Sequence, residues 1–290
     1  IMVALTYHAP DSLEEAVQLL STARQPVKLL SGGTDLIIQM QGLIQDERLV
    51  VDVKKIPGMR AADWMEDHLR LGPSMSCAQF TKRQDIEAVF PGLVEAAYLI
   101  GSTQVQGRAS IGGNLCNASP AADTIPALIV NRAACLIQGL NGTRRVNVED
   151  FLTGVGQQCL ASDELLVAIE VPSPAARTRD AYLRFIPRTE MDIAVAGAAV
   201  SVTLDDTGVC TNARVAIGAV APTAILVPSA ADALIGTKLE DDALHAAAAA
   251  SSQAANPISD RRGTVEFRRH VVGVLTKRAA KIAANRVGAV

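Results

Sequence analysis

Glycine and small polar residues are concentrated in one stretch of the chain, from Ile100 to Asp123. Glycine clusters are expected where the backbone takes a positive φ, or where a bound group comes too close for a side chain. The N–H groups of such a turn form a concave donor site that suits a phosphate. Hydroxyl and amide side chains between the glycines add donors, and Asp123 offers an acceptor for a sugar hydroxyl or a ring N–H. The stretch therefore indicates a nucleotide site.

A second glycine motif occupies residues 28–36, where an apolar strand leads into the turn Gly32-Gly33-Thr34-Asp35. A single Gly- and Ser-rich run is more often an ordinary surface loop than a ligand site. Two runs of this kind in one chain fit the two phosphates of a diphosphate better than either run alone would.

Nothing in the sequence indicates an acid–base pair beside a substrate pocket. The four histidines lie far from the glycine motifs in sequence, and no H-E-x-x-H, G-x-S-x-G or Walker pattern occurs. Gly154-Val-Gly156 lacks the third glycine of a Rossmann fingerprint. Any redox chemistry would therefore belong to a cofactor that the protein positions and tunes. Three classes stay open on the residues: an electron-transfer subunit, a stand-alone oxidase or reductase, and a nucleotide-binding module without redox chemistry.

The composition of the chain limits which partners it is expected to bind and where in the cell it is expected to lie. A net charge of −3 argues against a nucleic-acid partner. The five cysteines are scattered, without metal-ligand spacing, which predicts reduced thiols and neither a zinc site nor an iron–sulfur cluster on this chain. No apolar run is long enough to enter a bilayer, and no signal peptide is indicated. We expect a cytoplasmic protein without membrane insertion.

Hydrophobic periodicity divides the chain into three expected domains, at residues 1–55, 56–175 and 176–290. The elements predicted in the first are a helix at 11–23, strands at 27–30 and 49–53, and a helix from Leu36 that stops at Gly42. Together they indicate a small βαβ-like unit, with the Gly32-Gly33 turn where a strand meets a helix.

The second and third domains combine further strands and helices. The second is predicted to contain strands at 69–72, 134–138, 144–148 and 165–171 and helices from 77, at 90–100 and at 124–130. Pro172-Ser-Pro174 favours an extended connector. The third is predicted to contain strands at 182–187, 194–204 and 213–220, a hairpin turn at 205–208, and helices at 229–234, 243–255 and 265–287.

The last helix carries a basic face, and the helix before it carries an alanine run at 246–250. Such a basic face is usually only solvated, and docking of a partner is the less favoured interpretation. The alanine run is a strong helix former and needs no function. The residues of the basic face are Arg268, Arg269, Lys277, Arg278, Lys281 and Arg286.

The two glycine motifs carry a resemblance to a known family. Leu-Ser-Gly-Gly-Thr-Asp-Leu at 30–36, followed by Ile-Gly-Ser-x-Gln-Val-x-x-x-x-Ser-Ile-Gly-Gly-Asn-Leu-x-Asn-Ala-Ser-Pro-Ala-Ala-Asp at 100–123, resembles the FAD-binding medium subunit of molybdenum hydroxylases, the xanthine dehydrogenase and carbon monoxide dehydrogenase medium-subunit family. The likeness extends through 188–194 and 266–269. It implies an α+β fold: a two-part FAD-binding domain of PCMH/VAO type, then a smaller C-terminal α+β domain with an antiparallel sheet and helices.

The resemblance also implies a function. This chain would be the FAD-binding electron-transfer subunit of a heterotrimeric molybdenum hydroxylase or dehydrogenase. It would take electrons from the [2Fe–2S] clusters of an iron–sulfur small subunit and pass them to an external acceptor, while a large subunit holds the molybdenum cofactor. The FAD is expected to be bound without a covalent bond. The alternative is a stand-alone FAD-dependent oxidoreductase.

The family's binding residues carry over by motif. The first motif would hold the diphosphate and line the flavin, and the second would hold phosphates and ribityl or ribose hydroxyls. Arg184 and Asp192 would lie near the polar edge of the flavin, with Ile193 on its face. The complete set of expected cofactor-binding residues is Lys28, Leu29, Leu30, Ser31, Gly32, Gly33, Thr34, Asp35, Leu36, Ser102, Ser110, Ile111, Gly112, Gly113, Asn114, Asn117, Asp123, Arg184, Asp192 and Ile193. No catalytic residue and no metal ligand is expected.

Two positions depart from the family pattern. Thr34 stands where some relatives carry a histidine after the glycine pair. Cys116 stands where alanine is common, and we interpret it as a small buried hydrophobic residue rather than a redox thiol.

Overall fold

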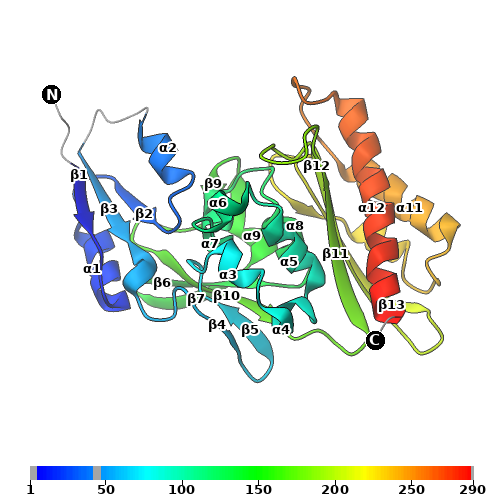
Figure 1. Ribbon diagram of the computed structural model, residues 1–290, viewed down its shortest axis with the longest axis horizontal. Helices are drawn as coiled ribbons and strands as arrows, with labels where there is room; N and C mark the ends of the chain where they lie inside the picture. Colours follow the sequence, from blue (N-terminus) through cyan, green and yellow to red (C-terminus); the bar gives the residue numbers. More distant parts are fainter. Residues whose placement is uncertain (1–4, 42–46, 289–290) are drawn as a thin grey trace.

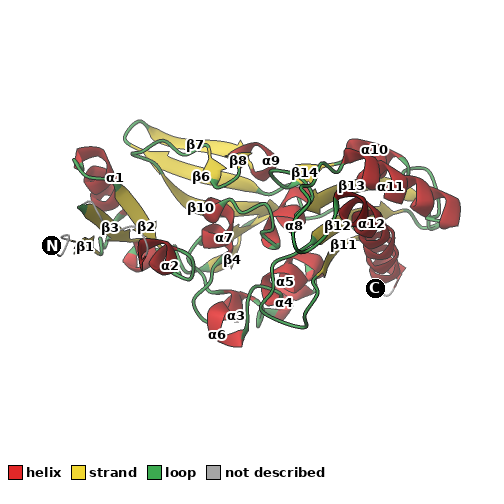
Figure 2. Cartoon of the chain, turned by 90° about the horizontal axis from the view of Figure 1, so that it is seen from above, coloured by secondary structure: helices red, strands yellow, loops and turns green. Residues whose placement is uncertain are grey.

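Three main β-sheets follow one another along the long axis of the molecule (Figure 1). The computed structural model describes residues 5–41 and 47–288. Within that part, helices lie beside each sheet, and the last sheet is antiparallel with two long helices against it (Figure 2). The predicted α+β class, with an antiparallel sheet and helices at the C-terminal end, is confirmed.

The first sheet belongs to a parallel unit in the order β1-β3-β2. Helix α1 begins because the Ser12 side chain accepts the Glu15 N–H, and it buries Ala16, Val17 and Leu20. The predicted βαβ unit is confirmed, whereas strand β1, which has exposed residues throughout, was not predicted. The expected helix stop at Gly42 lies outside the described residues. The elements are β1 (Leu5–His8), α1 (Leu13–Thr22), β2 (Val27–Leu30), α2 (Leu36–Gln41), β3 (Arg48–Asp52) and the 3-10 turn η1 (Val53–Lys55).

The second sheet is antiparallel, in the order β4-β5-β10-β6-β7. Its strands are β4 (Ala62–Trp64), β5 (His68–Leu71), β6 (Ala134–Gly139), β7 (Gly142–Asn147) and β10 (Leu165–Pro172), and a two-stranded ribbon pairs β8 (Leu152–Gly154) with β9 (Gln157–Gln158). Its helices are α3 (Cys77–Phe80), α4 (Gln84–Glu87), α5 (Pro91–Tyr98), α6 (Thr103–Gln106), α7 (Ile111–Asn117), α8 (Thr124–Val130) and α9 (Val148–Phe151). The predicted strands and the helices at α5 and α8 are confirmed.

The second glycine motif, for which no helix was predicted from the sequence, contains helices α6 and α7. Ser110 caps α7 by accepting the N–H of Gly113 at 3.1 Å. Of the four glycines in the motif only Gly101 has a positive φ, at 56°. Small residues permit close packing in a helix as well as in a loop, and the sequence pattern does not separate the two.

The third sheet is antiparallel, in the order β11-β12-β13-β14. Its elements are β11 (Thr178–Phe185), β12 (Ala196–Leu204), β13 (Cys210–Gly218), β14 (Ile225–Leu226), α10 (Pro228–Asp232), α11 (Asp241–Ala254) and α12 (Val265–Gly288). The three main strands and the three helices are confirmed, although β11 begins earlier than predicted and β13 lies a few residues earlier. Helix α12 packs on one face of this sheet, with α11 against α12, and α5 and α8 pack on the other face (Figure 1).

Asp180 on β11 joins the third sheet to the helices of the second. Its carboxylate accepts hydrogen bonds from the N–H groups of Gly92 and Leu93, at 2.9 and 3.1 Å, and from Asn131 Nδ2 at 2.7 Å. It therefore caps the first turn of α5, which has no side-chain cap of its own. Arg286 near the end of α12 donates to the Asp180 carbonyl at 2.7 Å. Burial raises the pKa of the Asp180 carboxyl to about 6, although its donors favour the charged form.

Replacing Asp180 with alanine is expected to destabilise the protein by about 3 kcal/mol, because three buried donors lose their acceptor together with the cap of α5. Urea unfolding measures the change. Asp206→Ala is the matched control, since its side chain is 98% exposed in the hairpin turn after β12. An unfolding free energy of Asp180→Ala within about 0.5 kcal/mol of the control would contradict this account.

Candidate functional site

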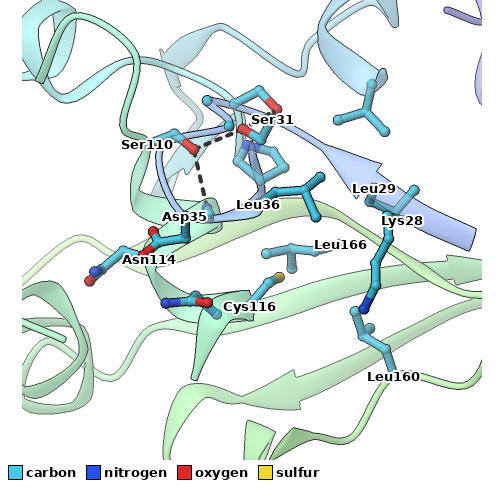
Figure 3. A pocket seen from close by; sticks show the side chains of 18 of the residues that line it. Lys28, Leu29, Ser31, Asp35, Leu36, Ser110, Asn114, Cys116, Leu160 and Leu166 are labelled. Carbon is cyan, nitrogen blue, oxygen red and sulfur yellow. Dashed lines mark hydrogen bonds between the residues drawn. The ribbon is translucent and has the colours of Figure 1, made fainter. Parts of the chain in front are cut away.

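A cavity of about 410 Å³ lies between the first unit and the second sheet (Figure 3). This volume is within the range of small-molecule sites, roughly 300–1,000 Å³. The structure brings both glycine motifs to it. The expected residues that line it are Lys28, Leu29, Ser31, Gly32, Gly33, Thr34, Asp35, Leu36, Ser110, Gly112, Gly113, Asn114 and Asn117.

The first motif presents open backbone donors to this cavity. Gly33 has a φ of +82°, which places the turn in a conformation that other residues rarely adopt. Within the described part of the chain, none of the N–H groups of residues 32–35 donates to a protein acceptor. Successive unbonded N–H groups in a turn form an anion site.

The second motif contributes in a different way. The N–H groups of Gly112 and Gly113 are already bonded, to the Pro73 carbonyl and to Ser110 Oγ, both at 3.1 Å. Asn114 Oδ1 accepts the Thr124 hydroxyl at 2.6 Å, which holds the amide in place. Its Nδ2 has no hydrogen-bond partner among the residues that the structure describes. The second motif therefore offers the cavity side-chain amides more than backbone N–H groups.

Hydroxyl groups of Ser31 and Ser110 join the two motifs where both line the cavity (Figure 3). Ser31 Oγ donates to Ser74 Oγ at 2.9 Å and lies 2.8 Å from Ser110 Oγ. Because the only hydroxyl proton of Ser31 goes to Ser74, the Ser110 hydroxyl donates to Ser31. Lys54 Nζ donates to the Ser31 carbonyl at 2.9 Å. This network fixes the start of the first turn against the cap of α7.

Glycine is required where the motifs touch. A Cβ on Gly32 would lie 2.1 Å from the backbone oxygen of Arg108, and one on Gly112 would lie 2.3 Å from Pro73 Cβ. Arg108 Nε also donates to the Gly32 carbonyl at 3.3 Å. These glycines therefore allow protein backbones to approach each other, in addition to leaving room for a ligand.

The remaining expected residues do not line the cavity and stay predictions; they are Leu30, Ser102, Ile111, Asp123, Arg184, Asp192 and Ile193. Ile111 is buried in the core of the second unit, and Ser102 is the N-cap of α6. Asp192 lies between Arg188 and Arg262, at 3.2 and 3.8 Å.

Asp123 and Arg184 form a buried pair where α8 meets β11. Asp123 accepts from Arg184 Nη1 at 2.7 Å and from the Tyr182 hydroxyl at 2.8 Å. Burial raises the pKa of the Asp123 carboxyl to about 6, and the charge of Arg184 and the Tyr182 hydrogen bond offset this only in part. Arg184 Nε is buried and has no partner among the described residues.

Several cavity residues were not predicted because they lie outside the glycine motifs. Gln39 on α2 donates to Asn117 Oδ1 at 3.1 Å and forms part of the wall. On the opposite wall, Glu164 is held by Arg144 at 2.7 Å, which lowers the pKa of its carboxyl. No sequence signal marks them, because only the sheet topology brings them to the cavity. The unpredicted polar lining residues are Gln39, Ser74, Gln158, Ser162 and Glu164.

Other chemistry is not supported by the described residues. All five cysteines are free, and burial raises the pKa of the Cys116 thiol to about 12, so it stays protonated at neutral pH. In residues 5–41 and 47–288 no group of histidine, cysteine and carboxylate side chains is arranged to hold a metal ion. No helix in the same part of the chain is both long and apolar enough to cross a membrane.

Two known families match this chain, each over a different part of it. Residues 3–174 match the family described as the FAD binding domain in molybdopterin dehydrogenase, and residues 181–283 match the CO dehydrogenase flavoprotein C-terminal domain. The first match covers more than half of the chain, so the chain belongs to this family of FAD-binding proteins. It is an oxidoreductase flavoprotein subunit, and FAD is its cofactor.

Individual relatives are similar over nearly their full length. The chain is 32% identical over 285 residues to the xanthine dehydrogenase FAD-binding subunit of Escherichia coli O157:H7, covering 98% of this chain and 97% of that protein. It is 32% identical over 277 residues to the carbon monoxide dehydrogenase medium chain of Hydrogenophaga pseudoflava, covering 96% of each. A solved structure of carbon monoxide dehydrogenase from that organism superimposes with a TM-score of 0.92 over 99% of both chains.

Gly32→Ala is expected to push the first turn away from Arg108 and to lower the affinity for FAD by at least about tenfold, since a 2.1 Å contact with backbone cannot be relieved by a side-chain movement. Gly107→Ala in the second motif is the control, because its Cβ would come no closer than 3.3 Å to the Gln104 carbonyl. Flavin titration by fluorescence quenching measures both. Equal affinities for the two variants would show that the motifs do not depend on this contact.

Proposed function

We propose that this chain is the electron-transfer subunit of a heterotrimeric molybdenum hydroxylase or dehydrogenase. It takes electrons from [2Fe–2S] clusters on a partner subunit and passes them to an external acceptor. The observation that carries the proposal is the cavity between the two glycine motifs, which combines open backbone donors with fixed amides and lacks an acid–base pair. The relatives support it by name, as a FAD-binding subunit, a medium chain and a subunit of a dehydrogenase complex.

The residues of the cavity fit FAD. The N–H groups of residues 32–35 would hold the diphosphate, whose charge they match. Asn114 and Asn117 would bind phosphate or sugar oxygens, and the Lys28 ammonium would add a positive charge at the wall. The flanking apolar residues Leu29 and Leu36 would exclude water from the cofactor.

Bound FAD supplies the redox chemistry, since it can exchange one electron or two. The protein binds it, orients it and controls access to it. We assign Arg184 and Asp192 to the polar edge of the flavin and Ile193 to its face. Two observations support this assignment: Arg184 Nε is a buried donor without a partner among the described residues, and Ile193 is 52% exposed.

Lys28, Asp35 and Glu164 are the charged side chains that line the cavity, and among the described residues none of them is hydrogen-bonded to a hydroxyl or a thiol. The substrate would therefore be oxidised on a large subunit that holds the molybdenum cofactor, and a small iron–sulfur subunit would connect it to this chain. We place the complex in the cytoplasm. We also propose that residues 1–55, 56–175 and 176–290 act as its three domains.

Asn114→Leu is expected to weaken FAD binding by about 2 kcal/mol, because it removes a polar contact and adds bulk beside the phosphates. Asn141→Leu, at the exposed β6–β7 turn, is the matched control. Acid precipitation of the yellow parent protein should release its FAD into the supernatant. Flavin that stays with the pellet would refute non-covalent binding, and an unchanged affinity of Asn114→Leu would remove Asn114 from the site.

Affinity purification from the native source should recover two further chains, one rich in iron–sulfur cysteines and one that binds molybdenum. The organic substrate of the complex should then bleach the flavin absorbance anaerobically, and removal of the molybdenum chain should abolish the bleaching while FAD content stays constant. A lone chain that oxidises an organic substrate would instead establish a stand-alone FAD-dependent oxidoreductase.

A further inference from the structure

A second cavity, of about 500 Å³, lies between α11 and α12. Helix α12 covers the face of the third sheet that points away from α5 and α8, and α11 packs against α12, so this cavity is separate from the cofactor site (Figure 1). We call it the α11–α12 groove. Its lining residues are His245, Ala248, Ala249 and Ser252 on α11, and His270, Gly273, Val274, Lys277, Arg278 and Lys281 on α12.

Each helix contributes one continuous face to the α11–α12 groove. The lining positions recur at intervals of three and four residues on both helices, which places them in one stripe per helix. Two such stripes side by side form the seat that a third helix occupies in a helix bundle.

The floor of the groove is made of small residues. Ala248, Ala249 and Gly273 leave space above the line where the helices meet, and Ser252 Oγ is turned away to donate to the Arg269 carbonyl at 2.7 Å. A Cβ on Gly273 would lie 2.5 Å from Ser252 Oγ and 2.9 Å from the Ala248 carbonyl. The two helices therefore pack closely, and the small residues leave the groove above them unfilled.

The wall on α12 is basic toward its C-terminal end, where Lys277, Arg278 and Lys281 lie within about one helical turn. Asp241 pairs with Lys277 and Lys281, at 3.2 and 3.1 Å, and so offsets part of the charge at one end. In the described part of the chain Arg278 forms no ion pair. The positive surface does not follow from overall composition, because the whole chain carries a net charge of −3.

We propose that the α11–α12 groove binds an acidic amphipathic helix of a partner polypeptide. Glutamate or aspartate side chains on one edge of that helix pair with Lys277, Arg278 and Lys281, and its small residues face the alanine floor. Lys277, Arg278 and Lys281 lie within about one helical turn. A small anion would need these cations to be free to converge on it, whereas Lys277 and Lys281 already converge on Asp241. Single-stranded nucleic acid is bound mainly by stacking of bases on large aromatic side chains, and no Phe, Tyr or Trp lines the groove.

A synthetic helix tests this directly on the full-length, FAD-loaded chain. The probe is a fluorescein-labelled, alanine-based peptide of about four turns, with glutamates at three- and four-residue intervals along one edge. The control peptide has glutamine in place of each glutamate. Fluorescence anisotropy should show binding of the glutamate peptide, with at least about tenfold weaker binding of the glutamine peptide, and the affinity should fall as salt is added. Inorganic tripolyphosphate serves as the free-anion competitor.

The variant Arg278→Glu with Lys281→Glu should abolish binding of the glutamate peptide while FAD content and circular dichroism stay unchanged. Lys238→Glu with Arg261→Glu makes the same change in charge at exposed positions of the same domain, outside the groove, and should leave binding intact. Equal loss in both variants, or no binding of the glutamate peptide at all, overturns the proposal. Binding of tripolyphosphate alone would identify the groove as a small-anion site, which also overturns it.

Discussion

The contact between the two glycine motifs determines the geometry of the cofactor cavity. Gly32 lies directly on the Arg108 backbone, and the hydroxyls of Ser31 and Ser110 are hydrogen-bonded across the junction. Gly32 follows strand β2, Arg108 follows helix α6, and Ser110 caps helix α7. The backbone on both sides of the contact is therefore held in place by a neighbouring strand or helix. Ser110 Oγ accepts the N–H of Gly113 and the Pro73 carbonyl accepts the N–H of Gly112, so the glycine N–H groups that stay open at the cavity are those of the first motif, among the described residues. The two motifs therefore have different tasks although their compositions are alike.

Part of the cavity wall comes from the second sheet. Leu166 on β10 and the segment around Glu164 reach the cavity only because β10 is the central strand of the second sheet, between β5 and β6. The Arg144 side chain on β7 holds Glu164 from the far edge of that sheet. The cofactor site thus depends on long-range antiparallel pairing, and a loss of sheet register would disturb it even with both glycine motifs intact.

Much of this structure could be predicted from local patterns. The capped helix after Ser12, the strand before the first glycine turn and the antiparallel strands of the third sheet are all marked by periodicity and capping residues. The helical form of the second motif was missed, because glycine and serine at this density suit a turn as well as a helix packed against Pro73. The place of Glu164 in the opposite wall was not predicted for another reason. It depends on which strands pair in the second sheet, and the residues around Glu164 do not indicate that pairing.

The long helix α12 shows why a basic face cannot be interpreted from sequence alone. Arg268 is buried and donates to the carbonyls of Val195 and Ala219, so its charge is used to hold loops of the third sheet. Arg286 is tied to Glu95 and to the Asp180 carbonyl, and therefore fastens α12 to α5. Only the middle of the helix, around Arg278, leaves cations on an open groove. The basic residues of α12 therefore have different roles. Those near its two ends hold the domain together, and those around Arg278 face the groove. The sequence alone does not distinguish the two groups.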